Sequence, residues 1–201
     1  MKLYYSPGAC SLSPHIVLHE SGLPFTGVLA STKTKKLQDG TDFHTINELG
    51  YVPVLELDNG ERLREGPAIV QYIADQVPAK NLAPANGTMD RYRLQEWLTF
   101  IGTELHKGHS PLFAPGTPED YKPLVRERLQ SRFAWTDKQL AGKDYLMGSF
   151  SVADAYLYTV SRWGQFVGVD TSGLSNLQAF KQRMEARPGV QAALKAEGLI
   201  K

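Results

Sequence analysis

The chain has 201 residues, of which 42% are hydrophobic and 21% are charged, so it is suited to one sizeable globular domain or two small ones. Its 22 basic and 21 acidic residues nearly cancel, which disfavours a nucleic-acid-binding protein. No apolar run approaches the ~18 residues of a membrane span, and the first residues lack the features of a secretory signal. We therefore expect a cytoplasmic protein with no membrane or nucleic-acid partner.

The first part of the chain predicts short strands that alternate with helices. The predicted strands are residues 2–5, 25–29, 52–57 and 61–63. The predicted helices begin near Ser11 and near Gly66. Between the last two strands, Asn59-Gly60 favours the tight turn of a hairpin. This order of elements predicts an α/β domain over residues 1–77, with helices packed on a mixed sheet.

The rest of the chain predicts helices only. Residues 78–88 contain two prolines and a glycine without periodicity, so they read as a linker. Apolar residues then recur at helical spacing, which predicts an all-helical domain over residues 89–201. Ser151 and Asp154 precede one of these apolar runs and predict a structural cap at a helix start.

Cys10 is the only cysteine, which excludes an intrachain disulfide and a four-cysteine zinc site. It lies between a turn and the start of the first predicted helix, where the positive helix end favours a reactive thiolate. A lone cysteine can equally be a small buried hydrophobic residue. The hydroxyls of Tyr5 and Ser11 lie close in sequence and could donate to a ligand thiolate, although packing and helix capping explain them too.

Two further positions are candidates for ligand binding. A cis bond between Val52 and Pro53 would turn the Val52 backbone outward, although cis bonds are uncommon. Glu65 and Gly66 precede a predicted helix, whose N-terminus could bind a carboxylate while Glu65 pairs with an ammonium group. Ordinary helix capping also explains this acid.

Histidines offer a weaker signal. Thr99, Thr103 and His106 share one helix face, which is either a binding face or a solvated one. His15 and His19 are four residues apart, but no third ligand accompanies them, so we predict no metal site. The chain also contains no glycine-rich phosphate loop.

Five stretches from end to end of the chain resemble the cytosolic glutathione transferases. They are KLYYSPGACSLSPH (2–15), YVPVL (51–55), EGPAIVQY (65–72), ELHKG (104–108) and SVADAY (151–156). The Cys10-Ser11 pair and the 104–108 stretch resemble the bacterial beta class specifically. The resemblance implies a thioredoxin-like first domain with a mixed four-stranded sheet, an all-helical second domain and a cytoplasmic homodimer. It also implies glutathione as co-substrate, with no cofactor bound permanently.

The resemblance further implies a glutathione site that draws residues from both domains. Its implied members are Ala9, Cys10, Lys35, Tyr51, Val52, Pro53, Glu65, Gly66, Thr99, Thr103, Glu104 and His106. Of these, Cys10 and His106 are expected to be catalytic, together with Tyr5 and Ser11. The superfamily often has a serine at the position of Gly66, and the beta class usually has an amide side chain at the position of Thr99. In both places this chain has a shorter side chain at the site.

Individual roles follow from the same resemblance. Cys10 is expected to contact glutathione and to form a mixed disulfide with it, while Val52, before a cis Pro53, clamps the cysteinyl part. Lys35 is expected to bind a carboxylate and Glu104 the ligand ammonium. His106 is expected to lie near the Cys10 sulfur and to change its charge near neutral pH.

The expected reaction is conjugation of glutathione to a small hydrophobic electrophile, for which aromatic and halogenated compounds are candidates. Helical position makes Phe113, Trp163 and Phe166 candidates for the walls of the electrophile site. Thiol–disulfide exchange through Cys10 and reductive dehalogenation are candidate side activities. The alternative is a non-catalytic ligand-binding or interaction protein on the same fold, because a fold alone does not determine function.

Overall fold

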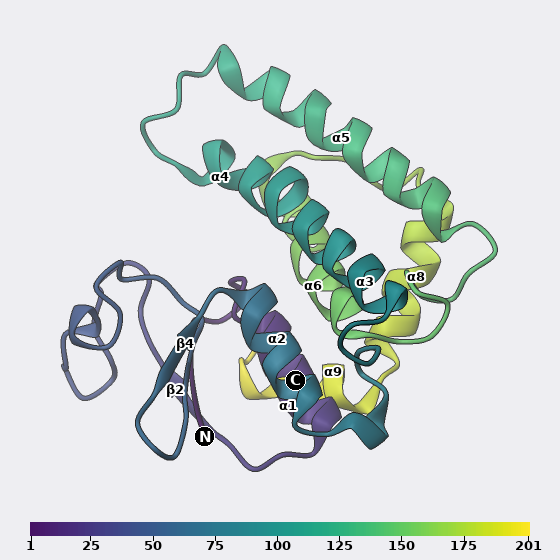
Figure 1. The fold of residues 1–201 in the computed structure, drawn as a ribbon. Coiled ribbons are helices and arrows are strands. Elements are labelled where there is room, and N and C mark those ends of the chain that lie inside the picture. Colours follow the sequence, from purple (N-terminus) through teal and green to yellow (C-terminus); the bar gives the residue numbers. More distant parts are fainter. The chain divides into compact units, whose positions relative to one another are not determined.

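A computed structural model describes residues 1–201, and the chain divides into two compact units (Figure 1). The N-terminal unit contains Met1–Ala83 together with Arg187–Lys201, and the helical unit contains Pro84–Ala186. This division falls inside the linker predicted at 78–88. It differs from the predicted domains at the C-terminus, because residues 187–201 join the N-terminal unit instead of the helical one.

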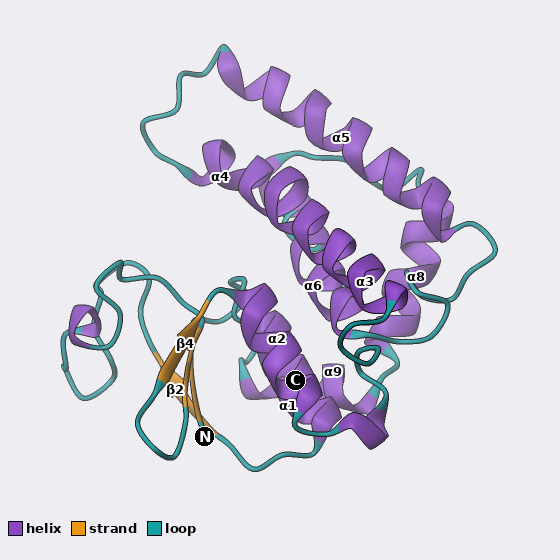
Figure 2. Ribbon diagram, viewed as in Figure 1, coloured by secondary structure: helices purple, strands orange, loops and turns teal.

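The N-terminal unit is built on a four-stranded mixed sheet (Figure 2). Its strands are β1 (Lys2–Tyr5), β2 (Thr26–Leu29), β3 (Val54–Glu56) and β4 (Arg62–Arg64), in the order β2-β1-β3-β4. Strand β1 runs parallel to β2 and antiparallel to β3, and β3 pairs antiparallel with β4. The predicted mixed sheet and hairpin are therefore confirmed.

Helices α1 (Leu12–Ser21), α2 (Gly66–Asp75) and α9 (Pro188–Ala196) belong to the same unit, with α1 packed against both others. Helix α1 ends at Gly22, whose left-handed backbone (φ 74°) lets its N–H bond the Leu18 carbonyl. Two short 3₁₀ helices, η1 (Phe43–Thr45) and η2 (Pro78–Lys80), lie in the connections.

The final helix reaches the N-terminal unit through close contacts with α1. Arg187 forms an ion pair of 2.7 Å with Glu20 of α1. A Cβ on Gly189 would lie 2.7 Å from the Glu20 side chain, so glycine permits this close approach. Apolar periodicity alone could not assign α9 to a unit, because its partner lies almost the whole chain length away.

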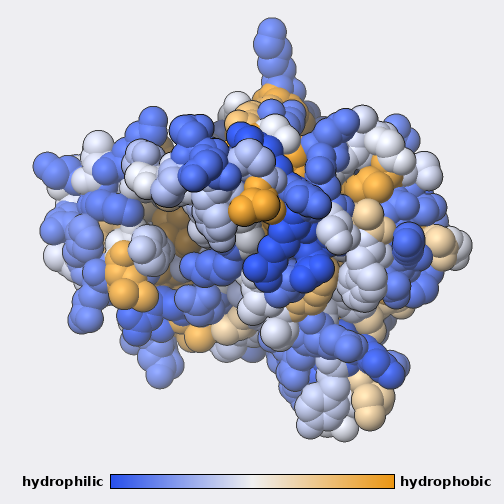
Figure 3. All heavy atoms as spheres, turned by 90° about the horizontal axis from the view of Figure 1, so that it is seen from above, coloured by the Kyte–Doolittle hydropathy of each residue, from blue (hydrophilic) through white to orange (hydrophobic).

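The helical unit contains α3 (Met89–Phe100), a π-helical segment η3 (Ile101–His106) and α4 (Lys107–Phe113), which run on without a break. It continues with α5 (Tyr121–Leu140), α6 (Val152–Ser161), α7 (Gly164–Val167) and α8 (Ser175–Glu185). None of the helices combines the length and the hydrophobicity that a membrane crossing requires. In the view of the whole chain from above, the visible surface is mainly hydrophilic, with hydrophobic residues in small separate groups (Figure 3).

Helix α6 is buried along its whole length, and the predicted cap at its start is confirmed. The buried Asp154 carboxylate accepts hydrogen bonds from the Ser151 N–H (2.8 Å), the Ser151 hydroxyl (2.9 Å) and the Leu146 N–H (2.9 Å). It thereby satisfies backbone donors that would otherwise be buried without partners.

Candidate functional site

The turn that follows β1 carries Cys10 to the start of α1. Cys10 is partly exposed, and its Sγ lies 3.3 Å from the Val52 carbonyl oxygen, in hydrogen-bonding contact. The helix begins two residues later, so the thiol lies at the positive end of the helix, as the sequence predicts. Cys10 is therefore not the fully buried hydrophobic residue that a lone cysteine can be.

Ser11 and Tyr5 have different surroundings. The Ser11 hydroxyl is buried, donates to the Ser6 carbonyl (3.2 Å) and accepts from the Ser6 N–H (3.0 Å), so it braces the turn. The Tyr5 hydroxyl makes no hydrogen bond within the chain. Burial, followed by the charge of Glu197, raises the pKa of Tyr5, so this hydroxyl keeps its proton and can donate.

The turn that carries Cys10 is tied to the C-terminus by a buried carboxylate. Glu197 Oε2 accepts from the Gly8 N–H (2.8 Å), and Glu197 Oε1 contacts His15 Nδ1 of α1 (2.8 Å). Both side chains are almost completely buried. The sequence gives no local signal for this role of Glu197, because its partners near residues 8 and 15 lie almost the whole chain length away.

Val52 and Pro53 form the opposite wall of the Cys10 site. Their peptide bond is cis, as the resemblance implies. Next to them, Lys35 donates to the Gly50 carbonyl (2.9 Å), and its ammonium lies 5.3 Å from the centre of the exposed Tyr51 ring. The Lys35 ammonium and the Tyr51 ring thus contact each other next to Val52 in the chain.

Glu65 lies at the first turn of α2, with its backbone in the left-handed region (φ 67°), which is unusual for a residue with a side chain. Its carboxylate is exposed and has no partner within the chain. Its carbonyl accepts from the Ala68 and Ile69 amides, and Pro67 has no N–H. The Gly66 amide is therefore the unused donor at this helix start. It lies near the cis proline, since a Cβ built on Gly66 would be 4.0 Å from the Pro53 side chain.

In the helical unit, His106 lies at the end of the π-helical segment. Its Nδ1 forms a 2.6 Å hydrogen bond with the Tyr156 hydroxyl of α6, and its ring contacts the Trp163 ring. Burial, followed by the positive charge of Lys107, lowers the pKa of His106 to about 4. The expectation that His106 changes charge near neutral pH is therefore wrong: the ring is neutral there.

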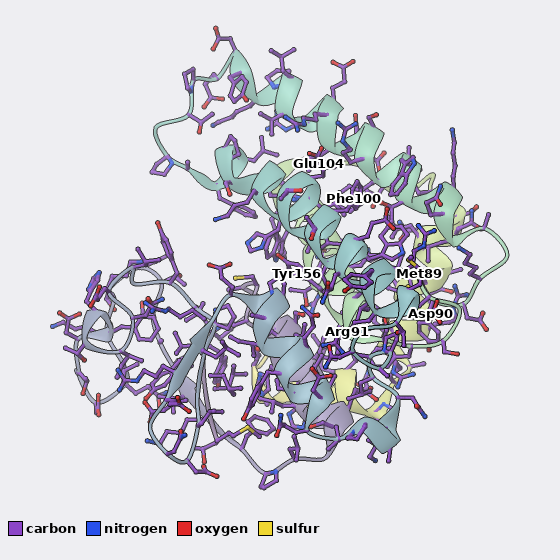
Figure 4. All side chains as sticks on the ribbon, in the orientation of Figure 1. Met89, Asp90, Arg91, Phe100, Glu104 and Tyr156 are labelled. Atoms are coloured by element: carbon purple, nitrogen blue, oxygen red, sulfur yellow. The ribbon has the colours of Figure 1, made fainter.

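Glu104 is engaged by two arginines of α5. Its carboxylate lies 2.7 Å from Arg132 and 3.2 Å from Arg128. The hydrogen bonds from Arg132 and Arg128 lower its pKa. Figure 4 shows Glu104 and Phe100 on the part of the helix that runs beside α5. The sequence did not identify these arginines, although their spacing of four residues places them on one helix face.

The remaining predicted residues vary in how they are placed. Thr99 and Thr103 are exposed, and the Thr103 hydroxyl donates to the Thr99 carbonyl (3.0 Å). Phe113 and Trp163 lie edge to face with ring centres 6.0 Å apart, so they form one aromatic group. Phe166 is exposed and makes no ring contact with them. Nowhere do three or more histidine, cysteine, aspartate or glutamate residues form a cluster that could hold a metal ion.

Comparisons with known proteins match both units. Residues 8–76 match the family model of the glutathione S-transferase N-terminal domain, and residues 100–188 match that of the C-terminal domain. Glutathione S-transferase GstA of Escherichia coli O157:H7 is 49% identical over 99% of this chain and 100% of its own length.

Two solved structures extend this similarity over the whole chain. A sphingomonad glutathione S-transferase complexed with glutathione is 50% identical, with a TM-score of 0.95 and full coverage of both chains. A bacterial beta class glutathione S-transferase from Sphingomonas chungbukensis is 48% identical, with a TM-score of 0.96 and full coverage of both chains.

Proposed function

Because the chain belongs to the glutathione S-transferase family, we propose that it transfers glutathione to small hydrophobic electrophiles. One observation carries this proposal. The Cys10 sulfur lies 3.3 Å from the Val52 carbonyl at the start of α1, while the unpaired Glu65 carboxylate marks the start of α2. The two helix starts suit the thiol and the amino-acid end of the same tripeptide.

Each part of glutathione then has a matching group in the N-terminal unit. Glu65 pairs with the ammonium of the γ-glutamyl residue, and the Gly66 amide binds its carboxylate. The backbone of Val52 pairs with the cysteinyl part. Lys35, which Tyr51 holds in place, binds the glycyl carboxylate.

In the conjugation step, the glutathione sulfur attacks the electrophilic carbon. The thiol proton leaves to solvent, a carbon–sulfur bond forms, and the leaving group departs with its electron pair. The Tyr5 O–H stabilises the thiolate by donating a hydrogen bond to it, because its raised pKa keeps it protonated. Holding both reactants at one site supplies the remaining acceleration.

Cys10 supports a second activity, thiol–disulfide exchange. Its thiolate attacks one sulfur of a disulfide, forms a mixed disulfide and releases the other half as a thiolate. The chain contains no second cysteine to resolve this intermediate. An external glutathione thiolate therefore attacks it, forms a new disulfide and restores the Cys10 thiolate.

We also propose a homodimer in which the helical unit of one copy completes the glutathione site of the other. The helical unit carries a cluster of Trp97, Phe100 and Trp135, of which Trp135 is 44% exposed. Beside it lies a cavity of about 400 Å³ lined in part by Glu104 and Arg132. An aromatic cluster with a charged border suits a protein partner.

Retention on immobilised glutathione, together with turnover of a halogenated nitroaromatic electrophile, tests the transferase proposal. We expect both activities in the wild-type chain. Retention without turnover would favour the non-catalytic ligand-binding alternative, and the absence of both would favour an interaction protein.

A mixing experiment tests the shared site. Cys10→Ala and His106→Ala chains are purified separately and combined into mixed dimers. If the site spans two subunits, each mixed dimer contains one complete site and regains glutathionylation. Failure to regain it, when both parent variants are dimeric and defective, would refute a shared role for His106.

A further inference from the structure

The helical unit has a second hollow that contains none of the residues of the proposed glutathione or electrophile sites. Its volume is about 350 Å³, and its walls come from the end of α6, from α7, from the loop that follows α7 and from α8. Its polar lining includes Arg162, Asp170, Ser172 and Lys181. The proposed transferase chemistry leaves all four without a role.

The two cations of this cavity have no acidic partners. The Nη1 of Arg162 is buried and has no hydrogen-bond partner. The Arg162 guanidinium carbon lies 5.6 Å from the centre of the Tyr158 ring, which orients the group without satisfying its N–H donors. Lys181, also partly buried, forms no ion pair. Because this Nη1 has almost no accessible surface, a bound anion would meet the remaining N–H groups and the charge of Arg162.

The remaining charges leave the cavity positive. Asp170 is the one acidic residue in its lining, and it is exposed. Its Oδ1 accepts from the Ser172 N–H (2.8 Å), and this hydrogen bond lowers its pKa, so it is ionised at neutral pH. Arg126 adds a cation next to the lining residue Gly168, since a Cβ on Gly168 would lie 3.3 Å from the Arg126 Nε, which donates to the Val167 carbonyl (2.8 Å).

Hydroxyl donors accompany these cations. The Thr171 hydroxyl oxygen accepts from the Gln178 amide (3.3 Å), which leaves its own proton to donate. Ser172 offers a second hydroxyl. A guanidinium, an ammonium and two hydroxyls together match an anion that has several acceptor oxygens.

The loop that follows α7 and carries these donors packs tightly against α7. The Val169 N–H donates to the Gly164 carbonyl (3.0 Å), and a Cβ on Gly164 would lie 2.7 Å from the Val169 carbonyl oxygen. Gly168 has a left-handed backbone (φ 74°). Glycines therefore let the loop fold back on α7, and its donors and Arg162 line the same cavity.

We propose that this cavity binds a phosphate group, carried either by inorganic phosphate or by a small phosphomonoester. The donor set favours a multivalent oxyanion over chloride. The volume of about 350 Å³ is more than ten times that of a water molecule in the liquid, about 30 Å³, so it leaves room for an organic remainder beside the phosphate.

Calorimetric titration of the full-length protein, without glutathione and at constant ionic strength, tests this proposal. The probes are inorganic phosphate, glycerol 1-phosphate and sodium chloride. We expect saturable binding of at least one phosphate probe, and amide shifts in ¹⁵N spectra confined to residues 161–181. Tighter binding of inorganic phosphate or of the ester identifies which source the site prefers. Heat that does not saturate, or equal heat with chloride, would overturn the proposal.

Four variants localise the effect. Arg162→Met should weaken phosphate binding at least about tenfold, because it removes a charge-assisted donor. Lys181→Met should weaken it several-fold, and Asp170→Asn should strengthen it by removing repulsion. Lys138→Met is the matched control, because it removes an exposed cation outside the cavity.

Two outcomes of the variant series decide the proposal even if Arg162→Met does not fold. Weakening by Lys181→Met together with strengthening by Asp170→Asn supports a site in the cavity. Equal effects of Lys181→Met and Lys138→Met would show a general charge effect and overturn it. Retention of Lys181→Met on immobilised glutathione should remain that of wild type, which separates this site from the proposed transferase site.

Discussion

Three candidate binding groups of the N-terminal unit differ from two of the helical unit in whether they already have partners within the chain. In the N-terminal unit, the Tyr5 hydroxyl, the Glu65 carboxylate and the Gly66 amide have no partner within the chain. These groups are half-buried or exposed at the ends of a strand and a helix, where solvent satisfies them until a ligand arrives. This unit therefore presents donors and acceptors that are ready for a ligand.

In the helical unit, the two charged or titratable candidates, Glu104 and His106, already have partners. Two arginines hold the Glu104 carboxylate, and the Tyr156 hydroxyl holds His106 at 2.6 Å. Such prior contacts fix the orientation of a side chain, and any ligand must share them or compete with them. Under the proposed function, this difference would assign the binding energy mainly to groups of the N-terminal unit and a preorganised orientation to groups of the helical unit.

The largest expected effect concerns Cys10. Incubation with oxidised glutathione should add one disulfide-linked tripeptide per chain, and Cys10→Ala should abolish this mass shift completely, because no other thiol exists. Conjugation should persist in part, since Tyr5 and the thiol of the bound glutathione remain. Intact-mass spectrometry and an electrophile assay check the two results. A mass shift that survives the substitution would contradict the assignment.

The buried contacts of Glu197 with Gly8 and His15 should make the stability of the N-terminal unit sensitive to a substitution near the C-terminus. Glu197→Ala leaves the Gly8 N–H and His15 without their buried partner, which should lower the free energy of unfolding by about 3 kcal/mol. Glu197→Gln can still accept from Gly8 and should cost less. Urea unfolding measures both, and Glu61→Ala, an exposed acid of the same unit, should change stability by less than about 0.5 kcal/mol. An equal loss in the alanine and glutamine variants would mean that charge alone matters.

The sequence predicted most of what local patterns encode. The four strands, the hairpin turn at Asn59-Gly60 and the cap at Asp154 each follow from residues close together in the chain, and the structure has all of them. The positions of Cys10 and Glu65 at helix starts followed from the same kind of signal.

Long-range partners could not be predicted in this way. Glu197 reaches Gly8 across 189 residues, and Arg132 reaches Glu104 from another helix. The same limit explains the error about His106. Its low pKa results from burial among Tyr156 and Trp163, which only the folded helical unit brings around it.

The neutral His106 predicts a pH effect on stability. Its pKa is about 4 in the folded chain and close to 6.5 when unfolded, so the unfolded state binds more protons between these values. The stability that neutral His106 contributes is present above pH 6.5 and is lost as the pH falls toward 4. Between pH 7 and pH 5 this loss amounts to about 2 kcal/mol.

A difference measurement isolates this residue. Urea unfolding of wild type and His106→Gln at both pH values cancels the other titrating groups, and the wild type should lose about 2 kcal/mol more than the variant. Equal losses would show that His106 titrates alike in the folded and unfolded states. The pH profile of conjugation should likewise show no inflection from His106 between pH 6 and 8.

The smallest expected effect concerns Glu65 of the N-terminal unit and the KM for glutathione. Glu65→Gln removes the charge that we propose pairs with the glutathione ammonium, while keeping the shape of the side chain. Because this carboxylate is exposed, its pairing is screened by water, and the KM for glutathione should rise only about fivefold. The kcat should stay within about twofold, since the proposed contact of Glu65 is with the end of the tripeptide that does not react. Glu61→Gln removes the same charge from the neighbouring hairpin and should leave both constants unchanged. A fall in kcat at constant KM in Glu65→Gln would contradict a binding role, and would mean that this acid acts on the thiol through the strained turn at the start of α2.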